Sequence, residues 1–205
     1  MGKTLKATCK MCRRESVSLC GKEKCAFKRR PFPPGVHGPT AGKSRLSGFG
    51  IQLREKQKAK RLYNIMETQF RNYFAKATKT KGDTGVIMLQ LLETRLDNVI
   101  YRLGLAKTRR QSRQMVNHGF VEINGKKVDI PSYQCRVGEV VAIREIKQKK
   151  GLLNDIDERL KAAQPPSWLT SEAGKLSGKI ISIPEGEDLK TVFDPKLIVE
   201  FYSRT

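Results

Sequence analysis

The sequence predicts an α+β protein in which a mostly helical N-terminal domain is joined to a module with a small antiparallel sheet. Three observations support this fold class. Apolar residues recur at three- and four-residue intervals over 51–77 and again over 86–104, a pattern typical of amphipathic helices. Short β-rich runs flank Asn124-Gly125, which favours a hairpin. Four cysteines lie within residues 9–25, where a hydrophobic period is missing, so we expect metal rather than a core to order this segment.

The first half of the chain divides at its glycines and prolines. Residues 1–50 are rich in Gly, Pro and basic side chains, and we expect an extended or looped chain held by metal and by a partner. Residues 51–77 contain neither Pro nor Gly and predict one long helix. The run from Gly82 to Gly85 interrupts the pattern, after which 86–104 predicts one kinked helix or two consecutive helices.

The second half predicts shorter elements with clear end signals. Thr108 can cap a helix over 109–118, and Gly119 supplies its left-handed stop. Asn124-Gly125 predicts a type I′ turn within a hairpin over 120–128. The remaining predictions are a strand over 137–146, a helix over 152–163, a strand over 180–183 and a closing helix over 195–203 capped by Asp194.

Positive charge is concentrated in the first two-thirds of the 205-residue chain, whose formal net charge is +21. Residues 1–80 carry 20 basic and 4 acidic side chains, whereas residues 151–205 carry 7 and 9. Such an excess repels itself unless a polyanion neutralises it, which favours nucleic acid as a partner. An anionic membrane is the second candidate, but the sequence has no apolar stretch of 18 residues and no apolar signal core, so we expect a cytoplasmic protein without a membrane partner.

The cysteines at 9, 12, 20 and 25 form two close pairs suited to one tetrahedral zinc ion, Zn²⁺. Four reduced structural cysteines are the alternative, and His37 could replace one ligand, although a histidine in a basic loop is more often solvent-exposed or in contact with phosphate. Four thiolates would leave no open position on the metal, so we expect a structural ion rather than a hydrolytic one. Cys135 stands alone and carries no predicted role.

Basic side chains gather in three runs: Lys28 to Arg30; Lys56, Lys58, Lys60 and Arg61; and Arg109, Arg110 and Arg113. Arg109 and Arg113 are four residues apart, so they should share one helical face while Met115 and Val116 face the core. Such a helix can lay guanidinium groups against phosphates. A solvated charged face is the alternative for each run.

Catalytic motifs are missing from the sequence. It contains no Walker-type loop, no G-x-S-x-G, no H-E-x-x-H and only two histidines, at 37 and 118. We therefore expect no enzymatic activity.

Several segments together resemble a known family. They are Leu92–Gly104, Gln114–Gly119, Ile123–Val128, Ile130–Tyr133, Arg29–Gly38, Gly50–Arg61, Gln69–Phe74, Pro166–Leu169 and Ile198–Arg204. The chain resembles bacterial small-subunit ribosomal protein number four, in its zinc-binding, cysteine-containing form. One departure is the spacing of seven residues between Cys12 and Cys20, where such relatives usually have a longer stretch.

The resemblance implies an architecture and a set of partners. Residues 93–178 would form an inserted α/β RNA-binding module, and 179–205 would return to the N-terminal domain of residues 1–92. The protein would bind small-subunit ribosomal RNA early in assembly, at a helical junction of the 5′ domain. It would lie in the ribosome near the channel by which mRNA enters, contact small-subunit protein number five, and contribute to translational accuracy. We do not expect a homo-oligomer.

With the basic runs, the resemblance gives a set of expected RNA contacts. They are Lys28, Arg29, Arg30, His37, Lys43, Arg45, Arg54, Lys56, Lys58, Lys60, Arg61, Arg71, Arg95, Arg102, Arg109, Arg110, Arg113, Asn117, His118, Lys126 and Lys127. A free RNA-binding regulator and a zinc-dependent RNA-modifying enzyme are the alternative functions.

Overall fold

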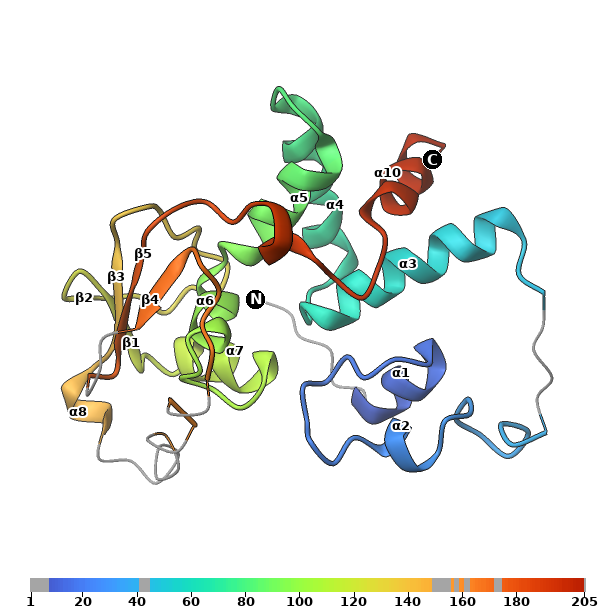
Figure 1. The fold of residues 1–205 in the computed structure, drawn as a ribbon, viewed down its shortest axis with the longest axis horizontal. Helices are drawn as coiled ribbons and strands as arrows, with labels where there is room; N and C mark the ends of the chain where they lie inside the picture. The colour runs from blue at the N-terminus through green and yellow to red at the C-terminus, as the bar shows by residue number, and fades with distance from the viewer. Residues whose placement is uncertain are drawn as a thin grey trace. The chain divides into compact units, whose positions relative to one another are not determined.

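A computed structural model of the chain has two compact units, one of Met1–Leu89 with Thr191–Thr205 and one of Gln90–Lys190 (Figure 1). It describes residues 8–40, 45–148, 156, 159–160, 163–171 and 175–204. The first unit is helical and the second carries a five-stranded sheet, which confirms the α+β class. The helix predicted over 152–163 lies largely outside the described residues.

The described helices of the first unit are short. They are α1 (Thr8–Glu15), α2 (Ala26–Arg29), α3 (Gly48–Leu62), α4 (Glu67–Lys79) and α10 (Pro195–Ser203), and α5 (Thr84–Glu93) begins there. The single helix predicted over 51–77 is wrong, because the chain turns between α3 and α4 with Asn64 at φ 53°. The apolar period continues across this turn, since Leu62 and Ile65 still face the interior, so periodicity alone did not reveal it.

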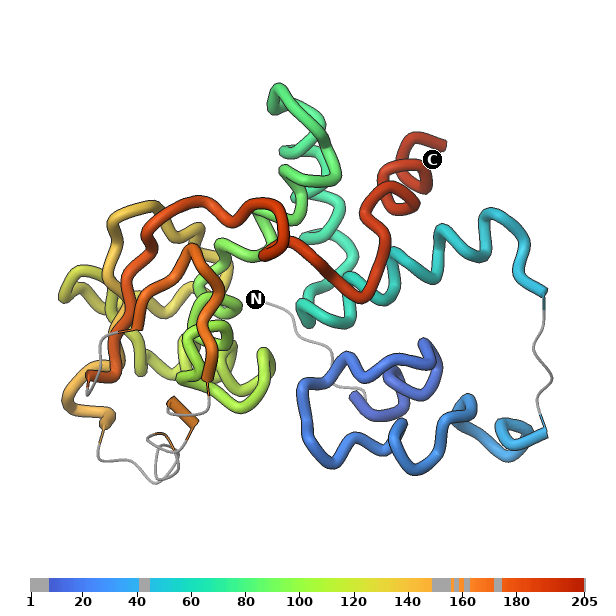
Figure 2. Tube along the Cα trace, viewed as in Figure 1, coloured from blue at the N-terminus to red at the C-terminus, as the bar shows by residue number. Residues whose placement is uncertain are grey.

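The C-terminal helix packs on α3, although the two are far apart in sequence (Figure 2). Pro195 opens α10, and the Asp194 carboxylate caps it by accepting from the Lys196 amide at 2.8 Å. Phe201 is buried with its ring centroid 5.4 Å from that of Phe49. The predicted closing helix over 195–203 is therefore confirmed.

The N-terminal segment is more regular than the sequence suggested. We expected loops throughout 1–50, but α1 and α2 form there, and a small core of Cys12, Leu19 and Cys25 lies between them. Buried Glu15 joins this segment to α3, because its carboxylate accepts from Arg61 and, at 3.3 Å, from Arg54.

The second unit contains α6 (Leu96–Arg102), α7 (Arg109–Asn117), β1 (Val121–Ile123), β2 (Lys126–Lys127), β3 (Val140–Ile143), α8 (Glu145–Gln148), β4 (Leu169–Ser171), β5 (Ser177–Ile180) and a 3-10 turn, η2 (Gly186–Leu189). The strands are antiparallel in the order β2-β1-β3-β5-β4. Asn124 and Gly125 have φ of 48° and 76°, as the predicted hairpin turn requires. The Thr108 cap of α7 is also confirmed, since its hydroxyl accepts from the Gln111 amide.

One core joins the sheet to α6 and α7. It includes Leu96, Ile100, Met115, Val141 and Trp168, each buried to 1% exposure or less. The strand predicted over 180–183 is wrong in position, because Ile181 and Ile183 are about half exposed and the strand ends at Ile180. Gly178 lies in β5, where an added Cβ would collide with the Leu103 side chain.

Candidate nucleic-acid interface and cysteine cluster

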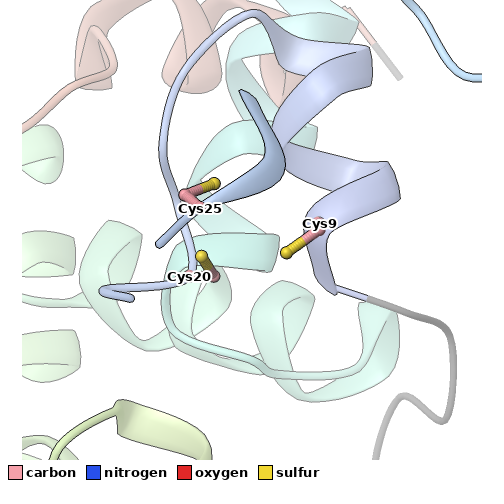
Figure 3. Close-up of side chains that lie close together, drawn as sticks. All are labelled: Cys9, Cys20 and Cys25. Carbon is pink, nitrogen blue, oxygen red and sulfur yellow. The ribbon is translucent and has the colours of Figure 1, made fainter. Parts of the chain in front are cut away.

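Three cysteines of the N-terminal segment converge in the structure. The Sγ atoms of Cys9, Cys20 and Cys25 all lie within 4.8 Å of one another (Figure 3). Cys9 comes from α1, Cys20 from the loop that follows, and Cys25 immediately precedes α2. All are free thiols.

Cys12 lies in the same small core, one helical turn after Cys9. Its sulfur accepts a hydrogen bond from the Leu19 amide at 3.3 Å, which holds the thiol side chain in one orientation. Burial raises the pKa of the Cys12 thiol to about 12. Burial also acts to raise the pKa of Cys25, but hydrogen bonds with the Phe27 amide and with the side chains of Ser18, Cys20 and Cys12 together outweigh it and bring that pKa to about 7.

The donor set fits a closed tetrahedral metal site. Thiolates are the ligands zinc prefers in structural sites, and amide hydrogen bonds to ligand sulfur are the outer contacts that orient such ligands. All four cysteines belong to one small core or pack against it.

Basic side chains from the first predicted run lie at the surface. Lys28, Arg29 and Arg30 are exposed, as are His37, Arg45 and Arg71, whereas Lys43 lies outside the described residues. The sequence analysis missed Arg13, whose guanidinium carbon lies 4.8 Å from the centre of the Phe32 ring. The pair Arg13-Arg14, directly after Cys12, was the sequence signal for a further basic site.

The second run is arranged differently from the prediction. The four basic residues of 56–61 lie early in the long helix predicted over 51–77, but in the structure they occupy the last turns of α3. Lys56 is 7% exposed, donates to Glu67 at 2.8 Å, and lies 4.3 Å from the centre of the Phe201 ring, so it joins helices rather than facing solvent. Lys58 pairs with Glu55, Lys60 with Glu67, and Arg61, like Arg54, with Glu15.

A hydrogen-bond network holds the side chains of two arginines of the second unit, Arg102 and Arg109. Buried Glu93 binds Arg102 through two contacts of 2.8 Å and accepts from Asn98 at 2.8 Å. Asn98 in turn accepts from Arg109 Nε at 2.7 Å. The Arg109 guanidinium lies 4.5 Å from the centre of the Tyr101 ring, so an aromatic face and the Asn98 amide, which Glu93 in turn holds, fix its position.

Arg113 does not share the exposed face that we expected for it. It is 2% exposed and donates to Asp97 at 3.3 Å, and Arg95, fully buried, donates to the same carboxylate at 2.6 Å. The helical spacing of Arg109 and Arg113 was correct, but α7 packs against α6 along the side that carries Arg113. Arg110, Asn117, His118, Lys126 and Lys127 are exposed, and Lys127 lies 3.6 Å from Asp129.

The chain matches two family models and many relatives along most of its length. Residues 3–93 match the ribosomal protein S4/S9 N-terminal domain, and residues 94–141 match the S4 domain. Small ribosomal subunit protein uS4 of Thermodesulfovibrio yellowstonii is 52% identical over 205 residues, covering 96% of each chain. The chain belongs to the uS4 family. The uS4 proteins of Thermus thermophilus, 45% identical over 100% of both chains, and of Acetivibrio thermocellus, 48% identical over 97% of both, are similar to it as well.

Membership of the uS4 family confirms the family suggested by sequence and the expectation that the chain is not an enzyme, since this is a structural family of ribosomal proteins. The S4-domain match covers α6, α7 and the first strands of the sheet, and it begins directly after Glu93. Arg102 on α6 and Arg109 on α7 lie within it. Among the described residues, no helix has the length and apolar character needed to cross a bilayer.

Proposed function

We propose that this chain is a primary ribosomal-RNA-binding protein that organises the 5′ domain of small-subunit rRNA during assembly. Exposed basic side chains on both units carry this proposal, beside membership of the uS4 family. Lys28, Arg29, Arg30 and Arg110 are exposed without an ion pair to any described residue, so they are available to phosphate.

The chain acts through two separate RNA-binding domains, residues 1–92 with 179–205 and residues 93–178, whereas the compact units of the structure divide after Leu89 and after Lys190. Each meets a different part of a helical junction, because phosphates in a folded junction have a fixed geometry that two domains can recognise together. In the second unit, Arg102 and Arg109 are held ready by Glu93 and Asn98. Buried Lys56, Arg95 and Arg113 hold helices together and do not contact the RNA.

Cys9, Cys12, Cys20 and Cys25 together hold one zinc ion. The ion supplies structural cross-linking, because four thiolates complete its coordination shell. The small core around Cys12 and Cys25 is too limited to hold this segment alone, and the Glu15 contacts to Arg54 and Arg61 connect it to α3.

Finer assignments rest on the family resemblance. The protein acts in the cytoplasmic ribosome near the channel by which mRNA enters, contacts small-subunit protein number five, and contributes to decoding accuracy. It binds these partners as a single copy.

Sedimentation of cell extracts through high-salt sucrose gradients tests the function. The protein should move with small subunits and with their early assembly particles. A free regulator would stay in the soluble fraction at the top of the gradient, and that distribution would refute the proposal.

A further inference from the structure

A cavity of about 380 Å³ lies beside the cysteine cluster, and three of the four described residues that line it are arginines. Arg13 comes from α1, Arg29 from α2, and Arg30 directly follows α2, while Ala26 is the fourth described residue of the lining. At about 30 Å³ per water molecule in the liquid, the cavity has room for on the order of a dozen waters. A phosphate group with its sugar therefore fits.

Arg13 is held in place before any ligand arrives. Its Nε and Nη2 atoms donate to the carbonyl oxygens of Phe32 and Pro33, both at 3.0 Å, and the guanidinium lies over the Phe32 ring. These contacts leave Nη1 without a hydrogen-bond acceptor among the described residues. A donor fixed in this way loses little conformational entropy when it binds an anion.

Arg29 and Arg30 bring two further positive charges to the same cavity. Both are exposed, and neither forms an ion pair with a described residue. Like charges around one cavity repel unless an anion lies between them. Guanidinium groups bind phosphate oxygens through paired hydrogen bonds, which favours an oxyanion as the ligand.

We propose that this cavity binds a single backbone phosphate of the RNA, with Arg13, Arg29 and Arg30 as donors. The inference rests on the proposed function and adds Arg13 and the cavity to it. A carboxylate is less suitable, because its two oxygens are satisfied by one guanidinium fork, whereas a phosphodiester flanked by sugar oxygens offers acceptors to several arginines.

Binding of the full-length protein to a 5′-domain rRNA transcript tests the site. The double variant Arg29→Ala/Arg30→Ala should bind at least tenfold more weakly, and the slope of log affinity against log salt should become shallower by about 1. The matched control is Lys22→Ala/Lys24→Ala, which removes two exposed charges from the same segment but none from the cavity lining. The control should bind nearly as well as the unaltered protein.

Single methylphosphonate substitutions in the transcript locate the phosphate. One position should weaken binding of the unaltered protein and cause no further loss with the double variant. Equal losses in the double variant and its control would overturn the phosphate site. Unchanged RNA affinity with weakened binding of neighbouring small-subunit proteins would also overturn it, and would assign the cavity to an acidic protein partner. If the unaltered protein does not bind the transcript, the proposed function fails together with the inference.

Discussion

Charged side chains in this protein divide into those that hold the fold and those that face solvent. Arg95 and Arg113 share the buried carboxylate of Asp97, whereas Arg110, on the same helix as Arg113, is exposed. Sequence spacing placed Arg109 and Arg113 on one side of α7 but could not show that α6 covers Arg113. The two roles can be separated by substitutions at neighbouring positions.

Arg113→Ala should destabilise the second unit by about 3 kcal/mol, because breaking a buried ion pair leaves Asp97 with Arg95 as its remaining described ion-pair partner. Urea unfolding followed by Trp168 fluorescence measures this, since the single tryptophan is buried in that unit. Arg110→Ala is the control and should change stability by less than about 0.5 kcal/mol while weakening RNA binding. A stable Arg113→Ala variant with reduced RNA affinity would return Arg113 to the RNA contact set.

Glu67 makes the stability of the first unit depend on pH. Burial acts to raise its pKa, but hydrogen bonds from Lys56, Lys60 and Tyr202 outweigh this and lower the pKa from 4.5 to about 2. A lowered pKa means that the carboxylate contributes stability above pH 4.5 and that this contribution disappears as pH falls towards 2.

Glu67→Gln should therefore unfold more easily than the unaltered protein at pH 6, and the difference between them should shrink as pH approaches 2. Helical circular dichroism during urea unfolding at several pH values measures it. A difference that stays constant between pH 6 and pH 2.5 would show that ionisation of Glu67 contributes nothing.

At the level of elements, local signals predicted the structure well where they were strong. The Thr108 cap, the Asn124-Gly125 turn and the Asp194-Pro195 helix start all form as expected, because each depends on a few adjacent residues. The turn at Asn64 was missed because apolar residues continue through it. The β5 position was missed because strand pairing, rather than the isoleucine run, selects residues 177–180.

In the candidate sites too, the sequence predicted what depends on nearby residues and missed what depends on packing between elements. Cysteine spacing predicted a cluster, and the structure brings Cys9, Cys20 and Cys25 together. The partners of the basic residues could not be predicted, because Glu15 lies far from Arg54 and Arg61 in sequence and because Glu67 and Glu93 pair with residues of neighbouring helices across turns that the sequence does not fix.

Zinc analysis tests the cysteine segment as a separate element. Protein purified under reducing conditions should contain one zinc, and Cys12→Ser should lose it while the Trp168 unfolding transition stays unchanged. Structural zinc contributes roughly 10–16 kcal/mol of binding free energy in finger peptides, so α1 and α2 should become sensitive to protease in the variant. Cys135→Ala, outside the cluster, should retain the metal. Protein free of zinc in every variant would contradict the proposed site.

On the scale of the whole molecule, two units of different architecture lie in one chain, and the chain returns from the second unit to the first at residue 191. Both units carry exposed basic side chains, whereas residues 151–205 carry a small net negative charge. We therefore expect a polyanionic partner to contact residues from the first two-thirds of the chain.

Salt-dependent binding to a 5′-domain rRNA transcript tests the central claim most directly. With about 6–10 phosphate contacts at roughly −0.7 each, the slope of log affinity against log salt should be on the order of −4 or steeper, and the transcript should outcompete homopolymer RNA of equal length. A slope near zero, or equal affinity for homopolymer, would contradict the claim that this protein recognises folded ribosomal RNA.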